Sequence, residues 1–201
     1  MPFPGRLYLL FTPQLCRREP WGTLTAALDG GVDMVQWRSK VADRDGFVRC
    51  RDLCRSRGIP LVVNDDVMLA VRGRADGAHV GQKDLPAEAA RKILVEGWLG
   101  VSTHEVAQIK AAALAGANYV GFGPCHPTST KGYEVGKTPA EIEAAIEACA
   151  HHKLPLFAIG GIDKTNLLAL RALGIDSIAV CRAILDSDDP RAAAAELRAC
   201  L

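Results

Sequence analysis

The sequence lacks any strong imbalance of charge. Its 24 lysines and arginines are matched by 23 aspartates and glutamates, so the formal net charge is +1, and neither sign forms a long run. Nucleic acids and anionic membrane surfaces are bound through a concentrated basic field. We therefore expect neither nucleic acid nor a membrane among the partners of this chain.

Long apolar runs and an export signal are missing as well. The longest apolar stretches are strand-sized, well short of the roughly 20 residues that span a bilayer. The first four residues, Met-Pro-Phe-Pro, have neither the basic region nor the apolar core of a signal peptide. These absences predict a cytoplasmic protein.

The seven cysteines form no complete metal-binding or disulfide pattern. Cys50 and Cys54 are spaced by one helical turn, but no second closely spaced pair completes a zinc site. Cys125 and His126 are adjacent, so their side chains point apart and are not expected to share a metal. We expect buried or partly exposed free thiols.

Eight short apolar runs alternate with segments of helical periodicity along the chain. The runs span residues 7–11, 34–37, 59–63, 77–80, 98–101, 119–122, 156–159 and 177–181. They are apolar throughout, as strands buried on both faces are. Strand–helix alternation indicates a parallel sheet, and eight units in 201 residues favour a closed (β/α)₈ TIM barrel of the α/β class over an open sheet. We expect one domain over residues 1–201.

Several helix ends can also be read from the sequence. Asp43 or Asp45 can cap the second helix, Gly58 can end it, and Gly174 can end the seventh. The glycine fingerprint of dinucleotide-binding folds does not follow the first strand, which argues against that class.

Polar side chains follow the predicted strands at their carboxyl ends, where barrel enzymes place their active sites. Gln36, Arg38 and Lys40 alternate at the end of the second strand and should share one face. Two cations beside an amide suit a phosphate or diphosphate attached to a hydrogen-bonding ring. A solvated strand end accounts for this triplet equally well.

Carboxylates follow the next two strands. Asp65 and Asp66 end the third strand, and Asp84 follows the fourth. Mg²⁺ is typically held by one or two carboxylates together with substrate phosphate oxygens. Asp65 or Asp66 alone can be a helix cap, but together with Asp84 and the basic triplet they favour magnesium–phosphate chemistry.

The later strand ends add candidate phosphate ligands. Ser102 and Thr103 can cap a helix or donate to phosphate, and His104 is interpreted as an exposed residue at a helix start. The polar connection 123–138 is long enough to be a functional loop, and it carries Thr128-Ser129-Thr130-Lys131.

Bare glycine backbone follows the seventh strand, and Cys181-Arg182 follows the eighth. This is the position of the recurrent phosphate site of barrels, where Gly160-Gly161 can approach an anion closely. The sequence therefore predicts two anion sites: one with a metal ion at the ends of the second to fourth strands, and one built from backbone amides after the seventh and eighth. They indicate two phosphorylated substrates, or one substrate phosphorylated at both ends.

The order of these motifs resembles thiamine phosphate synthase. The resemblance rests on segments 35–40, 63–65, 80–84, 100–104, 121–131 and 159–162, and it extends over nearly the whole chain. Each motif alone is weak, but six in order at the expected strand ends are specific. Asp66, Arg182 and Trp37 depart from the pattern of the family, and Arg182 stands where many relatives have serine.

The resemblance implies a reaction and a set of roles. The family joins a hydroxymethylpyrimidine diphosphate to a hydroxyethylthiazole phosphate and releases diphosphate. Gln36 would contact the pyrimidine, and Asp65 and Asp84 would hold the cofactor Mg²⁺. The diphosphate contacts would be Arg38, Lys40, Asn64, Ser102 and Lys131, of which Arg38, Ser102 and Lys131 are the expected catalytic residues. The thiazole phosphate contacts would be Thr128, Thr130, Gly161, Cys181 and Arg182.

The residue chemistry agrees with that reaction. A diphosphate leaves readily once Mg²⁺ and cations neutralise it, and the thiazole nitrogen attacks without a general base. Catalysis by positioning and electrostatics needs no Ser-His-Asp or Cys-His constellation.

Two other functions remain open at this stage. A thiazole tautomerase on the same barrel resembles the chain in the segment 131–134, but it carries a histidine where this chain has Pro124. A non-catalytic sensor of thiamine or thiazole phosphate would be expected to lose the metal carboxylates. The sequence does not determine the oligomeric state, and a homo-oligomer is one outcome.

Overall fold

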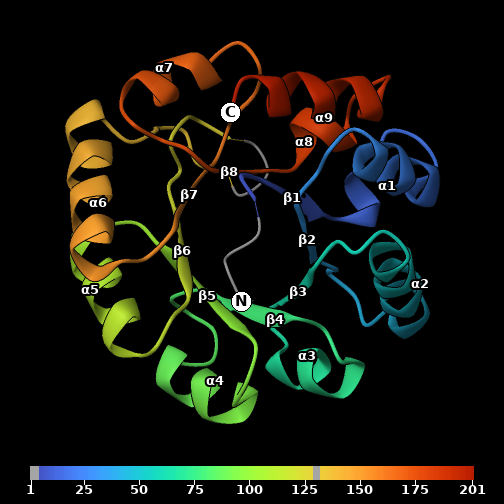
Figure 1. Ribbon diagram of the computed structural model, residues 1–201, viewed down its shortest axis with the longest axis horizontal. Helices are drawn as coiled ribbons and strands as arrows, with labels where there is room; N and C mark the ends of the chain where they lie inside the picture. The colour runs from blue at the N-terminus through green and yellow to red at the C-terminus, as the bar shows by residue number, and fades with distance from the viewer. Residues whose placement is uncertain (1–4, 129–131) are drawn as a thin grey trace.

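The barrel predicted from the sequence is present. The computed structural model describes residues 5–128 and 132–201, and within them eight parallel strands close into a ring (Figure 1). The strands are β1 (Leu7–Phe11), β2 (Met34–Trp37), β3 (Leu61–Asn64), β4 (Gly77–Val80), β5 (Trp98–Thr103), β6 (Tyr119–Phe122), β7 (Leu156–Ile159) and β8 (Ile178–Val180). Each strand pairs with the next, and β8 closes onto β1 with Ile178 beside Leu7. The expected (β/α)₈ fold is confirmed.

Helices surround the strands on the outside of the ring, as Figure 1 shows. They are α1 (Pro20–Asp29), α2 (Arg44–Arg55), α3 (Val67–Gly73), α4 (Ala87–Leu94), α5 (Val106–Leu114), α6 (Pro139–His152), α7 (Leu167–Ala172), α8 (Arg182–Leu185) and α9 (Pro190–Ala199), with a 3₁₀ turn η1 (Pro13–Leu15) after β1. The last helix, α9, packs against α1. Each helix in the described part of the chain is too short or too polar to span a membrane.

The predicted element ends agree with the structure to within two residues for the strands. The third strand begins at Leu61, because the Asp76 carboxylate accepts the hydrogen bond of the Leu61 amide at 2.8 Å. Asp43, not Asp45, caps α2 by accepting from the Gly46 amide at 2.8 Å. Gly58 and Gly174 follow α2 and α7 with φ of 65° and 97°, left-handed values that favour glycine.

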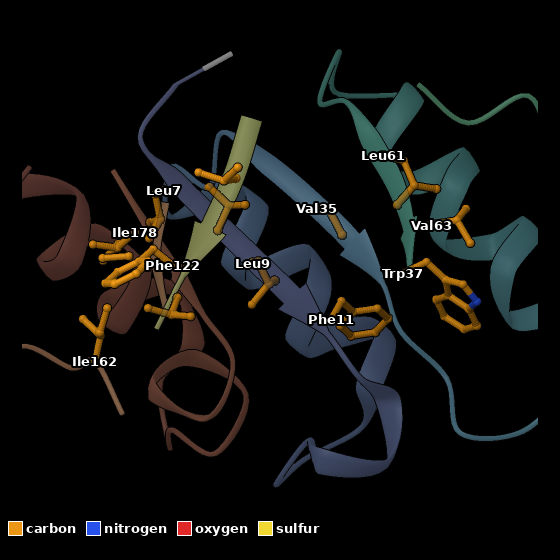
Figure 2. Close-up of a cluster of buried hydrophobic side chains, with 14 of the residues drawn as sticks. Leu7, Leu9, Phe11, Val35, Trp37, Leu61, Val63, Phe122, Ile162 and Ile178 are labelled. Atoms are coloured by element: carbon orange, nitrogen blue, oxygen red, sulfur yellow. The ribbon is translucent and has the colours of Figure 1, made fainter. Parts of the chain in front are cut away.

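Alternation along the strands produces two apolar layers. Leu7, Leu9 and Phe11 of β1 point outward into the layer between strands and helices (Figure 2). Tyr8 and Leu10 point inward and pack inside the barrel with residues of other strands. The inward layer is the smaller one and lies beneath the site described below.

The seven cysteines carry free thiols, as expected. Four are buried and three are partly exposed. Cys50 and Cys54 are both buried in α2, and burial raises the pKa of the Cys50 thiol well above its usual value. These two thiols act as small core residues.

A capping box begins α6 immediately after the connection 123–138. The Thr138 hydroxyl accepts from the Glu141 amide, and the Glu141 carboxylate accepts from the Thr138 amide at 2.9 Å. The Lys137 ammonium donates to Glu141 at 2.8 Å. Lys137 and then the Thr138 hydrogen bonds lower the pKa of Glu141 from 4.5 to about 2.

Glu141→Gln is expected to lower stability at neutral pH, and the difference from wild type should shrink in acid. Because the folded-state pKa is depressed, the carboxylate contributes fully above pH 4.5 and loses its contribution as the pH falls toward about 2. Urea unfolding at pH 7 and pH 3 measures both differences. Glu143→Gln, an exposed change on the same helix, is the matched control, and an equal pH dependence in both variants would contradict the assignment.

Candidate active site

A cavity of about 590 Å³ opens at the carboxyl ends of the strands, a volume typical of small-molecule sites. All eight strands contribute to its lining, in order Tyr8, Gln36, Asn64, His79, Ser102, Tyr119, Phe157 and Ala179. Residues 160–163 and 181–183, which follow β7 and β8, line it as well. The cavity thus lies where barrel chemistry is expected.

The polar end of β2 contributes two of its three predicted ligands to the cavity. Gln36 is buried, with 3% of its surface exposed, and Arg38 is half-buried immediately beyond the strand. The Arg38 amide donates to the Phe11 carbonyl at 2.9 Å, which anchors this residue to β1. Lys40 lies farther along, is exposed, and is not among the residues that line the cavity.

A chain of hydrogen bonds crosses the floor of the cavity. The Gln36 amide donates to the Tyr8 hydroxyl at 2.9 Å, and that hydroxyl lies 3.1 Å from the hydroxyl of Tyr119. Tyr119 lies 3.1 Å from Nδ1 of His79, whose Nε2 lies 2.9 Å from the Ser102 hydroxyl. This series of hydrogen bonds therefore connects Gln36 with Ser102, two residues predicted to contact different parts of the substrate.

Burial keeps the two tyrosines of this network protonated. It raises the pKa of both Tyr8 and Tyr119 well above the usual value of 10. Gly100 leaves the space they need, because a Cβ there would lie 2.2 Å from Cζ of Tyr119 and 2.4 Å from Nδ1 of His79. The floor thus offers neutral donors and acceptors at physiological pH.

Tyr8, His79 and Tyr119 are site residues that the strand pattern does not predict. Each lies inside an apolar run, and such a run predicts only a buried strand. A signal was present, since a buried polar group must find a hydrogen-bond partner and His79 interrupts the sequence Gly-Ala-His-Val of β4. Which partners it finds depends on the closure of the barrel, which sequence spacing does not specify.

The two predicted metal carboxylates follow neighbouring strands. Asp65 continues the pairing of β3 with β4, because its amide donates to the His79 carbonyl at 2.8 Å. It adopts a left-handed φ of 64°, a conformation that costs a non-glycine residue about 1–2 kcal/mol. The Asp84 carboxylate accepts from the Gly81 amide at 2.8 Å, just beyond β4.

Neither Asp65 nor Asp84 is among the residues that line the cavity, so the structure leaves these two carboxylates beside it, just beyond β3 and β4. Their chemistry fits a magnesium ion whose coordination the substrate would complete. The described residues contain no group of three or more His, Cys, Asp or Glu side chains able to hold a metal, so protein ligands alone would be incomplete. Two hard oxygen donors that leave positions for water and phosphate oxygens are the usual arrangement for Mg²⁺. Asp66 does not belong to the set, since it caps α3 by accepting from the Leu69 amide at 2.8 Å.

The glycine pair after β7 forms part of the cavity wall. Gly160 and Gly161 have φ of 97° and 63°. A Cβ on Gly161 would lie 2.4 Å from the Pro127 carbonyl oxygen and 2.8 Å from Cβ of His126. Only glycine therefore permits this close approach between the β7–α7 turn and the connection 123–138, on which Thr128 also lines the cavity.

Of the remaining predicted anion ligands, two lie within the described part of the chain and two lie outside it. Cys181 and Arg182 line the cavity directly after β8, and burial raises the pKa of the Cys181 thiol. The Arg182 guanidinium lies 3.8 Å from the Asp186 carboxylate. Thr130 and Lys131 lie outside the described residues.

The end of β5 differs from its predicted interpretation. The Thr103 hydroxyl is buried and donates to the Gly121 carbonyl at 3.2 Å, so it does not cap α5, and Thr103 is among the residues that line the cavity. His104, expected to be exposed at a helix start, is half-buried and lines the cavity. Its Nδ1 lies 2.6 Å from the Gly123 carbonyl oxygen, which holds the ring inward.

Comparison with known proteins agrees with this geometry. A family model described as thiamine monophosphate synthase matches residues 7–184. The thiamine-phosphate synthase of Chloroflexus aurantiacus is 38% identical, with 96% of this chain and 91% of that protein aligned. One from Prochlorococcus marinus is 42% identical over 87% of this chain, but the match spans 50% of that longer protein.

A solved structure extends the comparison to three dimensions. Thiamine phosphate pyrophosphorylase from Pyrococcus furiosus superposes with a TM-score of 0.85 at 30% identity, and the alignment covers 97% of this chain and 94% of that one. The residues matched by the family model, 7–184, include every strand that lines the cavity. The chain belongs to the thiamine monophosphate synthase family.

Proposed function

We propose that the protein joins a hydroxymethylpyrimidine diphosphate to a hydroxyethylthiazole phosphate, giving thiamine phosphate and diphosphate. Membership of the family makes it a transferase. One observation carries the proposal for this chain: a single cavity is lined by Gln36 and Arg38 from the end of β2 and by Gly161 and Arg182 from the turns after β7 and β8. Residues assigned to two phosphorylated substrates thus surround one space.

The floor network supports binding of the pyrimidine ring. Gln36 and the tyrosine hydroxyls offer neutral hydrogen-bonding groups to ring nitrogens and an amino group, and Phe157 adds an apolar ring beside Tyr8 at a centroid distance of 5.4 Å. A flat, neutral heteroaromatic ring matches such a floor in both polarity and shape.

The diphosphate is assigned to the part of the cavity formed by the ends of β2, β3 and β5. Arg38, Asn64 and Ser102 line the cavity there, and Lys40 and Lys131 are proposed to add charge from the surrounding loops. Asp65 and Asp84 would hold Mg²⁺, which when bound neutralises charge on the diphosphate leaving group. Arg38 supplies a cation in the partly buried wall, where charge is screened less than in water.

The thiazole phosphate is assigned to the part of the cavity that follows β7 and β8. Gly161, Cys181 and Arg182 line it together with Thr128, and Thr130 is proposed to complete the set. Backbone amides and hydroxyls bind a monophosphate without a metal ion. The arginine in place of the serine found in many relatives adds a guanidinium that can contact phosphate oxygens.

The reaction then needs positioning more than acid–base chemistry. The bond between the pyrimidine methylene carbon and the diphosphate oxygen breaks, and its electron pair leaves with the diphosphate. The lone pair of the thiazole nitrogen forms the new carbon–nitrogen bond. No proton is removed from the nucleophile and no covalent enzyme intermediate forms, so the residues act by orienting the partners and stabilising charge.

A coupling assay tests the proposal. The protein is incubated with both substrates and Mg²⁺, and thiamine phosphate and diphosphate are quantified, with a chelator as the control. Equal amounts of the two products, lost on chelation, support the synthase. Conversion of the thiazole carboxylate phosphate to its tautomer without coupling would instead identify a tautomerase, and tight binding of thiamine phosphate without turnover would identify a sensor. Action in the cytoplasm and assembly into a homo-oligomer stay predictions.

A further inference from the structure

His104 occupies a fixed position at the junction of β5 and α5. Its backbone amide donates to the Gln108 side chain at 2.7 Å, so the first turn of α5 holds it in place. The residue is half-buried and lines the cavity. The proposed reaction gives His104 no role.

The imidazole holds the root of the connection 123–138, called here the β6–α6 loop. Its Nδ1 lies 2.6 Å from the carbonyl oxygen of buried Gly123, directly after β6. A carbonyl oxygen can only accept, so Nδ1 carries the proton and donates it. A buried carbonyl deprived of its donor is costly, which makes this contact a strong constraint on where the loop begins.

The same imidazole contacts the second arm of the loop. The Tyr133 ring packs on it at a centroid distance of 6.2 Å and an interplanar angle of 49°. Tyr133 in turn pairs with Thr128: the Thr128 amide donates to the Tyr133 carbonyl at 2.8 Å, and the Tyr133 amide donates to the Thr128 carbonyl at 3.0 Å. A single side chain therefore holds both the root and the far arm.

The first arm of the loop runs along the end of β7 and the glycine pair that follows it. The Cys125 amide donates to the Ile159 carbonyl at 2.8 Å, and the His126 amide donates to the Gly160 carbonyl at 3.0 Å. Pro127 then lies against Gly161. A shift of the root would therefore displace the arm that supports Gly161 and carries Thr128.

We infer that His104 is a positioning residue for the thiazole phosphate side of the cavity. Its imidazole holds Gly123 and Tyr133 in the arrangement that presents Thr128 beside Gly161. It acts through these residues and does not take part in bond breaking. The inference rests on the proposed function, and it predicts that changes at His104 act more strongly on the thiazole phosphate than on the pyrimidine diphosphate, whose proposed contact Lys131 belongs to the same loop.

Three variants separate the two contacts. His104→Ala removes both, His104→Asn keeps an N–H near the position of Nδ1 without the ring, and His104→Phe keeps a ring for Tyr133 without a donor. His151→Asn, at an exposed position on α6, is the matched control. Michaelis constants for each substrate, kcat and thermal unfolding are measured for all four, and titration calorimetry with thiazole phosphate gives binding without turnover.

In His104→Ala we expect KM and Kd for thiazole phosphate to rise about tenfold, as loss of one well-placed hydrogen bond does. We expect smaller changes, about threefold, in KM for the pyrimidine diphosphate and in kcat, because Lys131 on the same loop is a proposed diphosphate contact. His104→Asn should recover more than half of the lost affinity, and His104→Phe should recover less.

Several results would overturn the assignment. These are an unchanged KM for thiazole phosphate in His104→Ala, an equal rise for both substrates, a fall in kcat alone, or no recovery in His104→Asn. Wild-type protein is measured first. Absence of product there contradicts the proposed function itself, whereas an active wild type with an unaffected His104→Ala contradicts only the role of His104.

Discussion

Asp84→Asn is expected to lower kcat/KM by about 10²–10³ while the midpoint of thermal unfolding changes little. Asparagine keeps a side-chain oxygen that can accept from the Gly81 amide, which in the native protein donates to the carboxylate at 2.8 Å. The substitution removes only the negative charge, so a structural effect and a metal effect are separated. Steady-state rates are measured over a range of Mg²⁺ concentrations.

The metal dependence is the decisive part of that measurement. If Asp84 holds Mg²⁺, the variant should need a higher Mg²⁺ concentration for half-maximal rate. Asp66→Asn is the matched control, because Asp66 lies beside Asp65 but caps α3 through the Leu69 amide, and asparagine is an equally good cap. Full activity of Asp84→Asn at wild-type Mg²⁺ levels would show that the metal assignment is wrong.

Arg38→Met is expected to lower kcat/KM by a similar factor, about 10²–10³, through loss of a cation that faces the leaving group. Arg38 lines the cavity and is half-buried, whereas Lys40 is exposed and outside the lining residues. Charge in the partly buried position is screened less by water. We therefore expect a smaller loss, about tenfold, for Lys40→Met.

The comparison of these variants tests the geometry as well as the charge. Arg38→Lys should recover only part of the rate, because a lysine makes a point contact where a guanidinium contacts two oxygens. Initial rates are measured with the pyrimidine diphosphate varied and the thiazole phosphate saturating. Equal losses for Arg38→Met and Lys40→Met would contradict the different positions that the structure gives these residues.

The architecture could be predicted because its signal is repeated eight times. A strand buried on both faces must be apolar throughout, and the helices between such strands keep their own periodicity. Shifts at element ends, such as the start of β3 at Leu61, depend on one side chain from a distant segment, the Asp76 carboxylate. Local pattern cannot specify such a partner.

The candidate site was predictable to a smaller extent. Gln36, Arg38, Asn64 and Ser102 stand out because they are polar residues at strand ends, and the structure places all four around the cavity. Asp66 and His104 were harder to interpret, since the choice between a cap, a solvent-exposed ring and a loop support depends on three-dimensional neighbours. The floor residues were missed because tyrosine and histidine within an apolar run resemble core.

A crystal structure of the protein with Mg²⁺, diphosphate and thiamine phosphate would test the central claim most directly. We expect the metal to contact Asp65, Asp84 and diphosphate oxygens, with Arg38 on the same diphosphate. The pyrimidine should lie on the floor beside Gln36, and the monophosphate should lie against Gly161 and Arg182. Products bound outside this cavity, or a metal held without either aspartate, would contradict the account.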